Sequence, residues 1–323
     1  MNALMISKKT PYILRSFPWF AVFLLCAHLM MLASLQADQL YFNQTIPGLT
    51  AQCFAPGLVS TQNLEHSRMI FSGNMQEMFW ATVPVPINEE TDETRIYYVR
   101  KMLTGWSNPE ILSLPVGNGR SPVLSPDDST LYFLATDPAS KNEIPPRQLI
   151  FQVDRLKNGW GLPQPCSTLP IITQGKMTLA FCFAENRNLY FDLGGPDENG
   201  RWRWKIYCAE FKDGRYREAK LLDDRINLGN NQTPFIAPDE SFIIFSSWRE
   251  GNLGGGDLYI AYRIKDGGWN EPVNLGTLVN TGAQERFPGL TPDGKYLFFT
   301  RSRKETKDDF YWIDAEIIGK EKQ

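Results

Sequence analysis

Side chains able to bind a polar ligand stand at corresponding points of a repeated sequence, directly before short apolar segments. Aligning these segments groups four residues at one position: His66, Gly119, Asn231 and Glu285. One residue further on, the alignment groups three more, with Thr178 as the approximate counterpart in the remaining copy: Arg120, Gln232 and Arg286. Charged side chains are costly to bury unless they are paired. Two interpretations follow, a bound polar ligand or ion and a solvated, mutually paired set without a ligand.

Histidine and carboxylates are the members of this set that could act as catalytic acids or bases. Loss of the N-terminal segment considered below would leave His66 as the only histidine, which excludes a zinc site built from several histidines. No G-x-S-x-G motif occurs, so a serine hydrolase would depend on this one residue. A glycoside hydrolase would need two carboxylates flanking a sugar bond, and the candidates are Glu65, Asp192 and Glu285. We expect no catalytic residue, metal or cofactor, and keep the glycoside hydrolase as the alternative.

Trp248 and Arg249 precede the run Gly254-Gly255-Gly256 and form a second candidate site. Tryptophan and arginine dominate the energetics of many protein interfaces, so this segment is either an interaction loop or a flexible hairpin connection. No Lys-Ser or Lys-Thr follows the glycine run, so it is not a phosphate-binding loop.

The elements that must position these residues repeat along the chain. Gly105-Trp106, Gly159-Trp160 and Gly268-Trp269, with a weaker copy ending in Tyr216, place aromatic residues 54, 56 and 53 positions apart. A fixed period of this size indicates stacked supersecondary units. Between these copies lie five apolar hairpins, three of which turn at Pro-Asp, a favoured turn pair: residues 121–133, 233–245 and 287–299.

A third apolar strand follows each hairpin, and the Gly-Trp segment opens a fourth. Four antiparallel strands in each of five units predict an all-β, five-bladed β-propeller rather than a β-sandwich, which does not repeat at this period. Leu58-Val59-Ser60-Thr61 matches Leu278-Val279-Asn280-Thr281. We therefore expect residues 52–58 to pair with residues 310–313 as the outer strand of the last blade, which closes the ring.

The segment from Ser125 to Phe133, the later Asp257-Leu258-Tyr259 and the Gly-Trp-x-x-Pro copies resemble the TolB-like, WD40-like β-propeller repeat. The resemblance covers about residues 50–318 and implies an exported bacterial protein that binds a ligand or another protein. Units one and three depart from it, with Ser72-Gly73-Asn74 and Ala184-Glu185-Asn186 in place of Ser-Pro-Asp.

The first 37 residues predict export. Lys8, Lys9 and Arg15 precede an uncharged, largely apolar run over residues 16–37, which is typical of a signal peptide. An uncleaved membrane anchor is the alternative. We expect a signal peptide over residues 1–37, one propeller domain over 38–323, and a periplasmic or secreted protein. Without residues 1–37 the 33 basic residues become 30 against 36 acidic ones, a formal charge of −6, and no basic stripe suggests a nucleic-acid partner.

The cysteines of the expected domain are either buried free thiols or include one disulfide; they are Cys53, Cys166, Cys182 and Cys208.

In a propeller the innermost strand of each blade lines the central channel, so the first candidate set should meet at one channel mouth. We expect Glu285 to pair there with Arg120 or Arg286. Two carboxylates within reach of one pocket would favour the enzyme. A carboxylate–arginine network around a filled channel would favour a non-catalytic module of the bacterial envelope, with an envelope protein, a carbohydrate or another small polar ligand as partner.

Overall fold

A computed structural model describes residues 41–85, 94–116, 119–140, 147–171, 176–303 and 307–320. The predicted signal peptide over residues 1–37 lies outside these residues. No helix among the described residues is long and apolar enough to cross a membrane.

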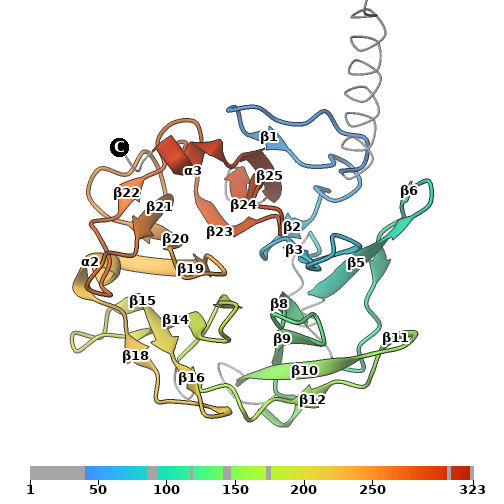
Figure 1. Cartoon of the computed structure of the whole chain (residues 1–323), viewed down its shortest axis with the longest axis horizontal. Helices are drawn as coiled ribbons and strands as arrows, with labels where there is room; N and C mark the ends of the chain where they lie inside the picture. Colours follow the sequence, from blue (N-terminus) through green and yellow to red (C-terminus); the bar gives the residue numbers. More distant parts are fainter. Residues whose placement is uncertain are drawn as a thin grey trace, which may run out of the picture.

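Five antiparallel sheets surround a central axis as the blades of a β-propeller, as Figure 1 shows. The first blade contains β2 (Leu64–Glu65), β3 (Ile70–Phe71), β4 (Glu77–Val83), β5 (Arg95–Met102), β6 (Gly105–Trp106) and β7 (Glu110–Ile111). The second contains β8 (Arg120–Leu124), β9 (Thr130–Thr136), β10 (Gln148–Leu156), β11 (Gly159–Trp160) and β12 (Gln164–Pro165), with the 3-10 turn η1 (Pro138–Ser140).

The third blade contains β13 (Phe181–Phe183), β14 (Leu189–Pro196), β15 (Trp202–Ala209) and β18 (Lys220–Leu221), with the small hairpin β16 (Phe211–Lys212) and β17 (Arg215–Tyr216). The fourth follows helix α2 (Asp224–Asn227) and contains β19 (Asn230–Ile236), β20 (Phe242–Trp248), β21 (Asp257–Tyr262) and β22 (Val273–Asn274). The fifth contains β23 (Glu285–Leu290), β24 (Tyr296–Arg303) and β25 (Lys307–Asp314), followed by helix α3 (Glu316–Lys320). The prediction of an all-β, five-bladed propeller is confirmed.

In the first, second and fifth blades, the turn between the first two strands is held by an acceptor side chain two residues after a hydroxyl. In the fifth blade the hydroxyl of Thr291 donates to Asp293 at 2.6 Å. The first blade uses Ser72 and Asn74 in the same way, at 2.8 Å. Asparagine can hydrogen-bond the backbone of a turn as aspartate does. In the third blade Ala184 supplies no hydroxyl, but Asn186 Oδ1 still accepts from the backbone N of Asn188, at 2.9 Å. Both units that depart from Ser-Pro-Asp therefore keep a side-chain acceptor in the turn.

The repeated Gly-Trp segments bring an aromatic ring under a cation at the end of the third strand. The guanidinium carbon of Arg155 lies 4.3 Å from the ring centroid of Trp160, and that of Arg263 lies 4.1 Å from Trp269. In the first blade Lys101 takes this place over Trp106, at 5.3 Å. Cation–π contacts of this kind stabilise the outer hairpins, which gives the 53–56-residue repeat a structural reason.

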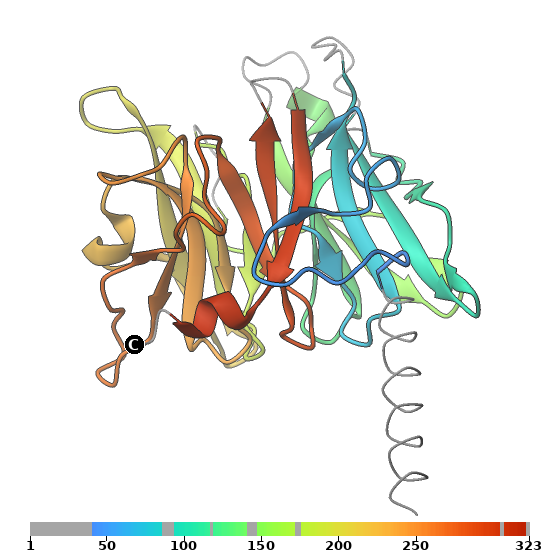
Figure 2. The same cartoon turned by 90° about the horizontal axis from the view of Figure 1, so that it is seen from above.

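The N-terminal segment closes the ring as predicted. Strand β1 (Gln52–Cys53) pairs antiparallel with β25, with Gln52 opposite Trp312 and Cys53 opposite Tyr311. Figure 2, an edge-on view, shows this segment in blue crossing the outside of the last blade in red. Closure thus removes the exposed strand edge of β25.

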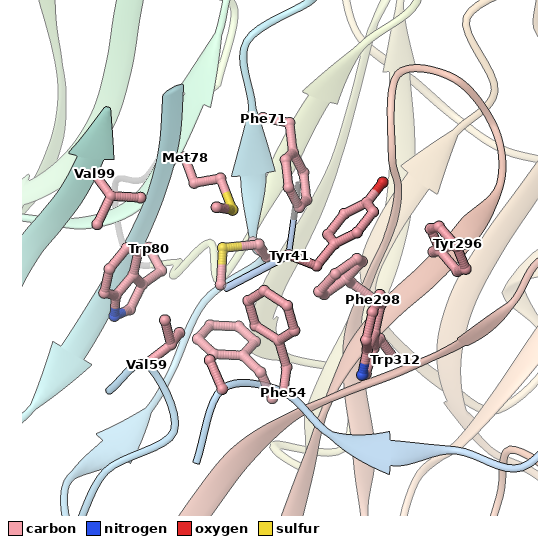
Figure 3. Close-up of a cluster of buried hydrophobic side chains, with 13 residues drawn as sticks. Tyr41, Phe54, Val59, Phe71, Met78, Trp80, Val99, Tyr296, Phe298 and Trp312 are labelled. Carbon is pink, nitrogen blue, oxygen red and sulfur yellow. The ribbon is translucent and has the colours of Figure 1, made fainter. Parts of the chain in front are cut away.

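An aromatic cluster fills the junction between the last blade and the first (Figure 3). Tyr41 and Phe54 come from the N-terminal segment, and their ring centroids lie 5.0 and 5.3 Å from that of Trp312. Phe54 also packs edge-on against Phe298, at 4.9 Å. The first blade contributes Trp80 to the same cluster. Strand β1 pairs with β25 through only two residues, and the packing of these aromatic rings holds the N-terminal segment in place in addition.

The cysteines in the described residues are free thiols, in line with the first of the two interpretations. Cys182 is buried, whereas Cys53, Cys166 and Cys208 are partly exposed.

Candidate functional site

The innermost strands of three blades share a β-bulge that fixes which of their residues are equivalent. The strand register shifts directly after Arg120, Gln232 and Arg286. The next residue in each strand has a positive φ, 50° to 52°: Ser121, Thr233 and Phe287. A bulge re-aims the side chains beside it. Arg120, Gln232 and Arg286 therefore occupy one position in three blades, as the sequence alignment predicted.

His66 belongs to this second position, which corrects the alignment by one residue. Glu65, not His66, is the counterpart of Glu285. Glu65 accepts hydrogen bonds from the backbone N and the Oγ1 of Thr61, at 3.0 and 2.8 Å. Glu285 accepts the same two from Thr281, at 3.2 and 2.7 Å. The first unit lacks the proline that marks the bulge elsewhere, so its sequence leaves the register open by one residue.

Side chains of the second and fifth blades contact His66 of the first blade or shift its pKa. Its ring centroid lies 5.2 Å from that of Phe287 in the fifth blade. Loss of solvation, together with the charges of Arg286 and Arg120, lowers the pKa of His66 to about 4, although Asp308 acts to raise it. A neutral imidazole is the favoured form at neutral pH. The mouth around His66 therefore includes the side chains of Arg120 and Arg286.

The ion pairs near the mouth differ from the expected ones. Arg286 Nη2 lies 2.7 Å from Asp308 on β25, and Arg301 Nε lies 2.8 Å from Glu285. The expectation that Glu285 pairs with Arg120 or Arg286 is wrong. The reason is the antiparallel register, which places Arg301 directly opposite Glu285 on the neighbouring strand of the same blade.

Three side-chain atoms of the predicted mouth residues are buried without a hydrogen-bond partner among the described residues: Asn231 Nδ2, Gln232 Oε1 and Arg286 Nε. Gln232 is 7% exposed and Asn231 is fully buried. Buried polar atoms are nearly always hydrogen-bonded in native proteins. An ordered water or a bound ligand would complete the hydrogen bonding of these atoms.

Arg68 fills the channel just below this level, a role that the sequence analysis missed. Its guanidinium donates to the carbonyl oxygens of Phe181 at 3.1 Å, of Pro288 at 2.5 Å and of Pro234. These carbonyls belong to the third, fifth and fourth blades, so the 4%-exposed side chain lies between their inner strands. A Cβ on Gly289 would lie 2.8 Å from Arg68 Cδ, so only glycine leaves the space.

The sequence contains a pattern that could have indicated this role of Arg68. Arg68 occupies the position that proline holds in three other units, at 122, 234 and 288. Gly289 follows one of these prolines, where the other two units have Val123 and Phe235. Two units thus differ from the repeat in ways that fit each other: Arg68 adds a long side chain in the first, and Gly289 leaves the space for it in the fifth.

The three candidate catalytic carboxylates are fully buried and hydrogen-bonded within the fold. Asp192 accepts from the backbone N of Leu179 at 2.7 Å in its own blade and from that of Thr233 at 2.8 Å in the next. Burial nevertheless raises the pKa of Asp192 to about 6. Glu65 and Glu285 accept hydrogen bonds from the loops that contain Thr61 and Thr281, respectively. Their oxygens are occupied in joining strands, loops and neighbouring blades.

Arg249 and Trp248 lie at the end of β20. The Arg249 guanidinium donates to the carbonyls of Ile226 at 2.9 Å and Leu228 at 3.1 Å, at the C-terminal end of α2. It also donates to Asn231 Oδ1 at 3.2 Å. A cation at these carbonyls satisfies acceptors that the helix leaves open. This geometry gives Arg249 a structural role, and an interaction role for Trp248 stays a prediction.

Within the described ranges, no group of three or more histidine, cysteine, aspartate or glutamate side chains is arranged to hold a metal ion.

No protein-family model and no curated protein matches the chain. Among solved structures it is similar to TolB from Acinetobacter baumannii, with 16% identity over 76% of this chain and 53% of TolB, at a TM-score of 0.45. It is also similar to an α-L-arabinofuranosidase from Lactobacillus brevis, with 15% identity over 78% and 87% of the two chains, at a TM-score of 0.47. A protein of unknown function from Dyadobacter fermentans matches with 13% identity over 80% and 83%, at 0.45.

The chain thus spans about half the length of TolB. Likenesses at this level carry no argument about activity, because the propeller fold hosts many unrelated functions. The resemblance to the TolB-like repeat extends to the fold, and its functional implications are proposals.

Proposed function

We propose that this protein is an exported, non-catalytic propeller module that binds a small polar ligand of the bacterial envelope at its channel mouth. The observation that supports this proposal is the mouth itself. The Arg68 side chain closes the channel below it. Polar side-chain atoms of Gln232 and Arg286 are buried without hydrogen-bond partners among the described residues.

The closed channel favours binding over passage through the ring. Arg68 is tied to three inner strands, so a molecule entering at the mouth meets a fixed end. Guanidinium, amide and imidazole groups from several blades surround that end. They can donate to the many acceptor oxygens of a carbohydrate, which is the ligand class we favour.

The carboxylates argue against the glycoside hydrolase alternative. A glycosidase needs one carboxyl group as acid and a second as base or nucleophile on either side of the sugar bond. Glu285 is held by Thr281 and Arg301, and Asp192 by backbone N–H groups of two blades. The carboxylate oxygens of Glu285 and Asp192 are therefore engaged within the fold rather than directed at a substrate.

A thermal-shift screen of the full chain against neutral and acidic oligosaccharides tests the proposal, because a ligand that binds only the folded state raises Tm. A hit should be lost in Arg120→Ala and Gln232→Ala and kept in Arg217→Ala, a matched surface arginine paired with the exposed Asp213. A hit that survives both mouth variants, or turnover of the sugar by the parent protein, would contradict the proposed function. A protein partner at the mouth would instead be captured by the parent chain and lost by both variants.

A further inference from the structure

A second cavity, of about 420 Å³, lies on the third blade next to the connection between α2 and β19. Its lining includes Lys176, Gly195, Asp197, Arg203, Lys205 and Tyr207. Ligand cavities typically have volumes of about 300–1,000 Å³. The hollow is therefore large enough for one sugar-sized molecule.

The pairing of β14 and β15 creates this hollow. Arg203, Lys205 and Tyr207 alternate along β15, so their side chains share one face of the sheet. Gly195 lies opposite Arg203 in the ladder and adds no side chain to that face. The opposite face is filled: a Cβ on Gly194 would lie 2.6 Å from the Trp204 ring. Further along the same face, Leu193 and Phe191 are buried against the second blade. Only the end of this face next to the β14–β15 turn is therefore open and cationic.

Positive charge outweighs negative charge in the cavity. Three cations line it, Lys176, Arg203 and Lys205, against the single carboxylate of Asp197 in the described lining. Asp197 accepts from the backbone N of Arg201 at 2.9 Å and from Arg203 Nε at 3.4 Å. This carboxylate therefore closes the β14–β15 turn and offsets one cation, so the described lining carries an excess of two positive charges in a chain with a formal net charge of −3.

Lys205 is the cation held most firmly in place. Its Nζ donates to the carbonyl oxygen of Asn227 at 2.5 Å and reaches that of Gly229 at 3.4 Å. An ammonium group has three N–H donors, so one remains for a ligand. Burial and then the charge of Arg203 lower the pKa of Lys205, while the carboxylate of Asp224 raises it; the net shift is downward, and an anion in the cavity would offset it.

We infer that this cavity binds a sugar-sized anion, whose carboxylate or phosphate group is held by Lys205, Arg203 and Lys176. Lysine and arginine are the side chains that proteins use for such groups. Tyr207 and Leu193 supply apolar lining for the body of the ligand. The cavity lining shares no residue with the predicted channel-mouth set, so this inference does not depend on the proposed function.

Isothermal titration of the full chain with glucuronate, glucose 6-phosphate and glucose tests the inference. We expect the two anions to bind, the neutral sugar not to bind, and the affinity for the anions to fall as salt is added. The stronger of the two anions identifies carboxylate or phosphate as the preferred group. Equal binding of glucose and glucuronate, or no binding of either anion, would overturn the inference.

Variants separate this cavity from the mouth. Lys205→Gln combined with Arg203→Gln should weaken the better anion at least tenfold. Lys176→Gln, an exposed position whose change leaves the fold intact, should weaken it about threefold. Lys212→Gln, on the exposed outer hairpin of the same blade, is the matched control and should bind as the parent does. Anion binding that is lost in Arg120→Ala but kept in the cavity variants would assign the anion to the mouth and refute this site.

Discussion

Arg301 and Glu285 face each other across β23 and β24, with the guanidinium Nε 2.8 Å from a carboxylate oxygen. At the same place in the first blade, Glu65 faces Thr82, so a hydroxyl stands where the fifth blade has a cation. A buried carboxylate without a nearby cation resists ionisation. Burial accordingly raises the pKa of Glu65 to about 7, although hydrogen bonds from Thr82 and Thr61 lower it. Glu65 and Glu285 thus occupy equivalent positions in two blades but have different electrostatic environments.

This difference predicts a pH-dependent effect of Glu65→Gln. The folded-state pKa of Glu65 lies above its ordinary value of 4.5, so the folded protein retains a proton that the unfolded chain loses between about pH 4.5 and 7. The cost of the buried charge is absent below this window and fully present above it, so stability falls as the pH rises through it. The variant avoids that cost. Its free energy of unfolding relative to the parent should rise by about 2–3 kcal/mol from pH 5 to pH 8, measured by urea denaturation.

Glu271→Gln is the control for this measurement, because the side chain of Glu271 is 76% exposed. Its stability relative to the parent should be nearly the same at both pH values. A Glu65→Gln difference that stays constant between pH 5 and pH 8 would show that Glu65 is ionised throughout.

Replacing Arg68 should destabilise the whole ring. Arg68→Met leaves the carbonyls of Phe181, Pro234 and Pro288 without their donor in a buried place, and we expect a loss of about 3–5 kcal/mol in the free energy of unfolding. Arg68→Lys keeps the charge but not the planar fork, so its loss should be smaller. Urea denaturation measures both, and Arg217→Met serves as the surface control. An Arg68→Met protein as stable as the parent would mean that water replaces the guanidinium.

Removing the closing segment should expose the edge of β25. We expect deletion of residues 38–60 to cost several kcal/mol, because it removes the β1 pairing together with the buried Tyr41 and Phe54. Phe54→Ala is a milder change that keeps the closing strand, and it should cost about 3–5 kcal/mol in the free energy of unfolding. Calorimetric unfolding of the two proteins tests this, and unchanged melting of the truncated chain would rule the closure out.

Trp269 should contribute to stability rather than to a binding surface. It is 2% exposed and lies under Arg263, so Trp269→Ala should cost about 3–5 kcal/mol in the free energy of unfolding. Trp202→Ala, at 47% exposure, is the comparison and should cost much less. Preserved stability of Trp269→Ala combined with lost ligand binding would show that the repeated aromatic residues form a site.

Local sequence patterns determined the hairpins, their number and the closing strand. Turn residues such as Asp293, the alternation of apolar side chains and the spacing of Trp106, Trp160 and Trp269 all act over a few residues, so they can be interpreted without knowing the fold. The same spacing grouped Arg120, Gln232 and Arg286 at one position. In the first unit, which lacks the marker proline, it assigned His66 one position too early.

The tertiary structure decided the partners of these side chains. Glu285 meets Arg301 because antiparallel register places them opposite each other, and Arg68 meets three carbonyls because the ring brings inner strands of distant sequence around one axis. The cationic cavity of Arg203 and Lys205 arises where Gly195 adds no side chain at the end of β14. Arg68 and Pro288 are 220 positions apart, and the repeat shows that their units are neighbours in a ring but not which of their side-chain and backbone atoms meet.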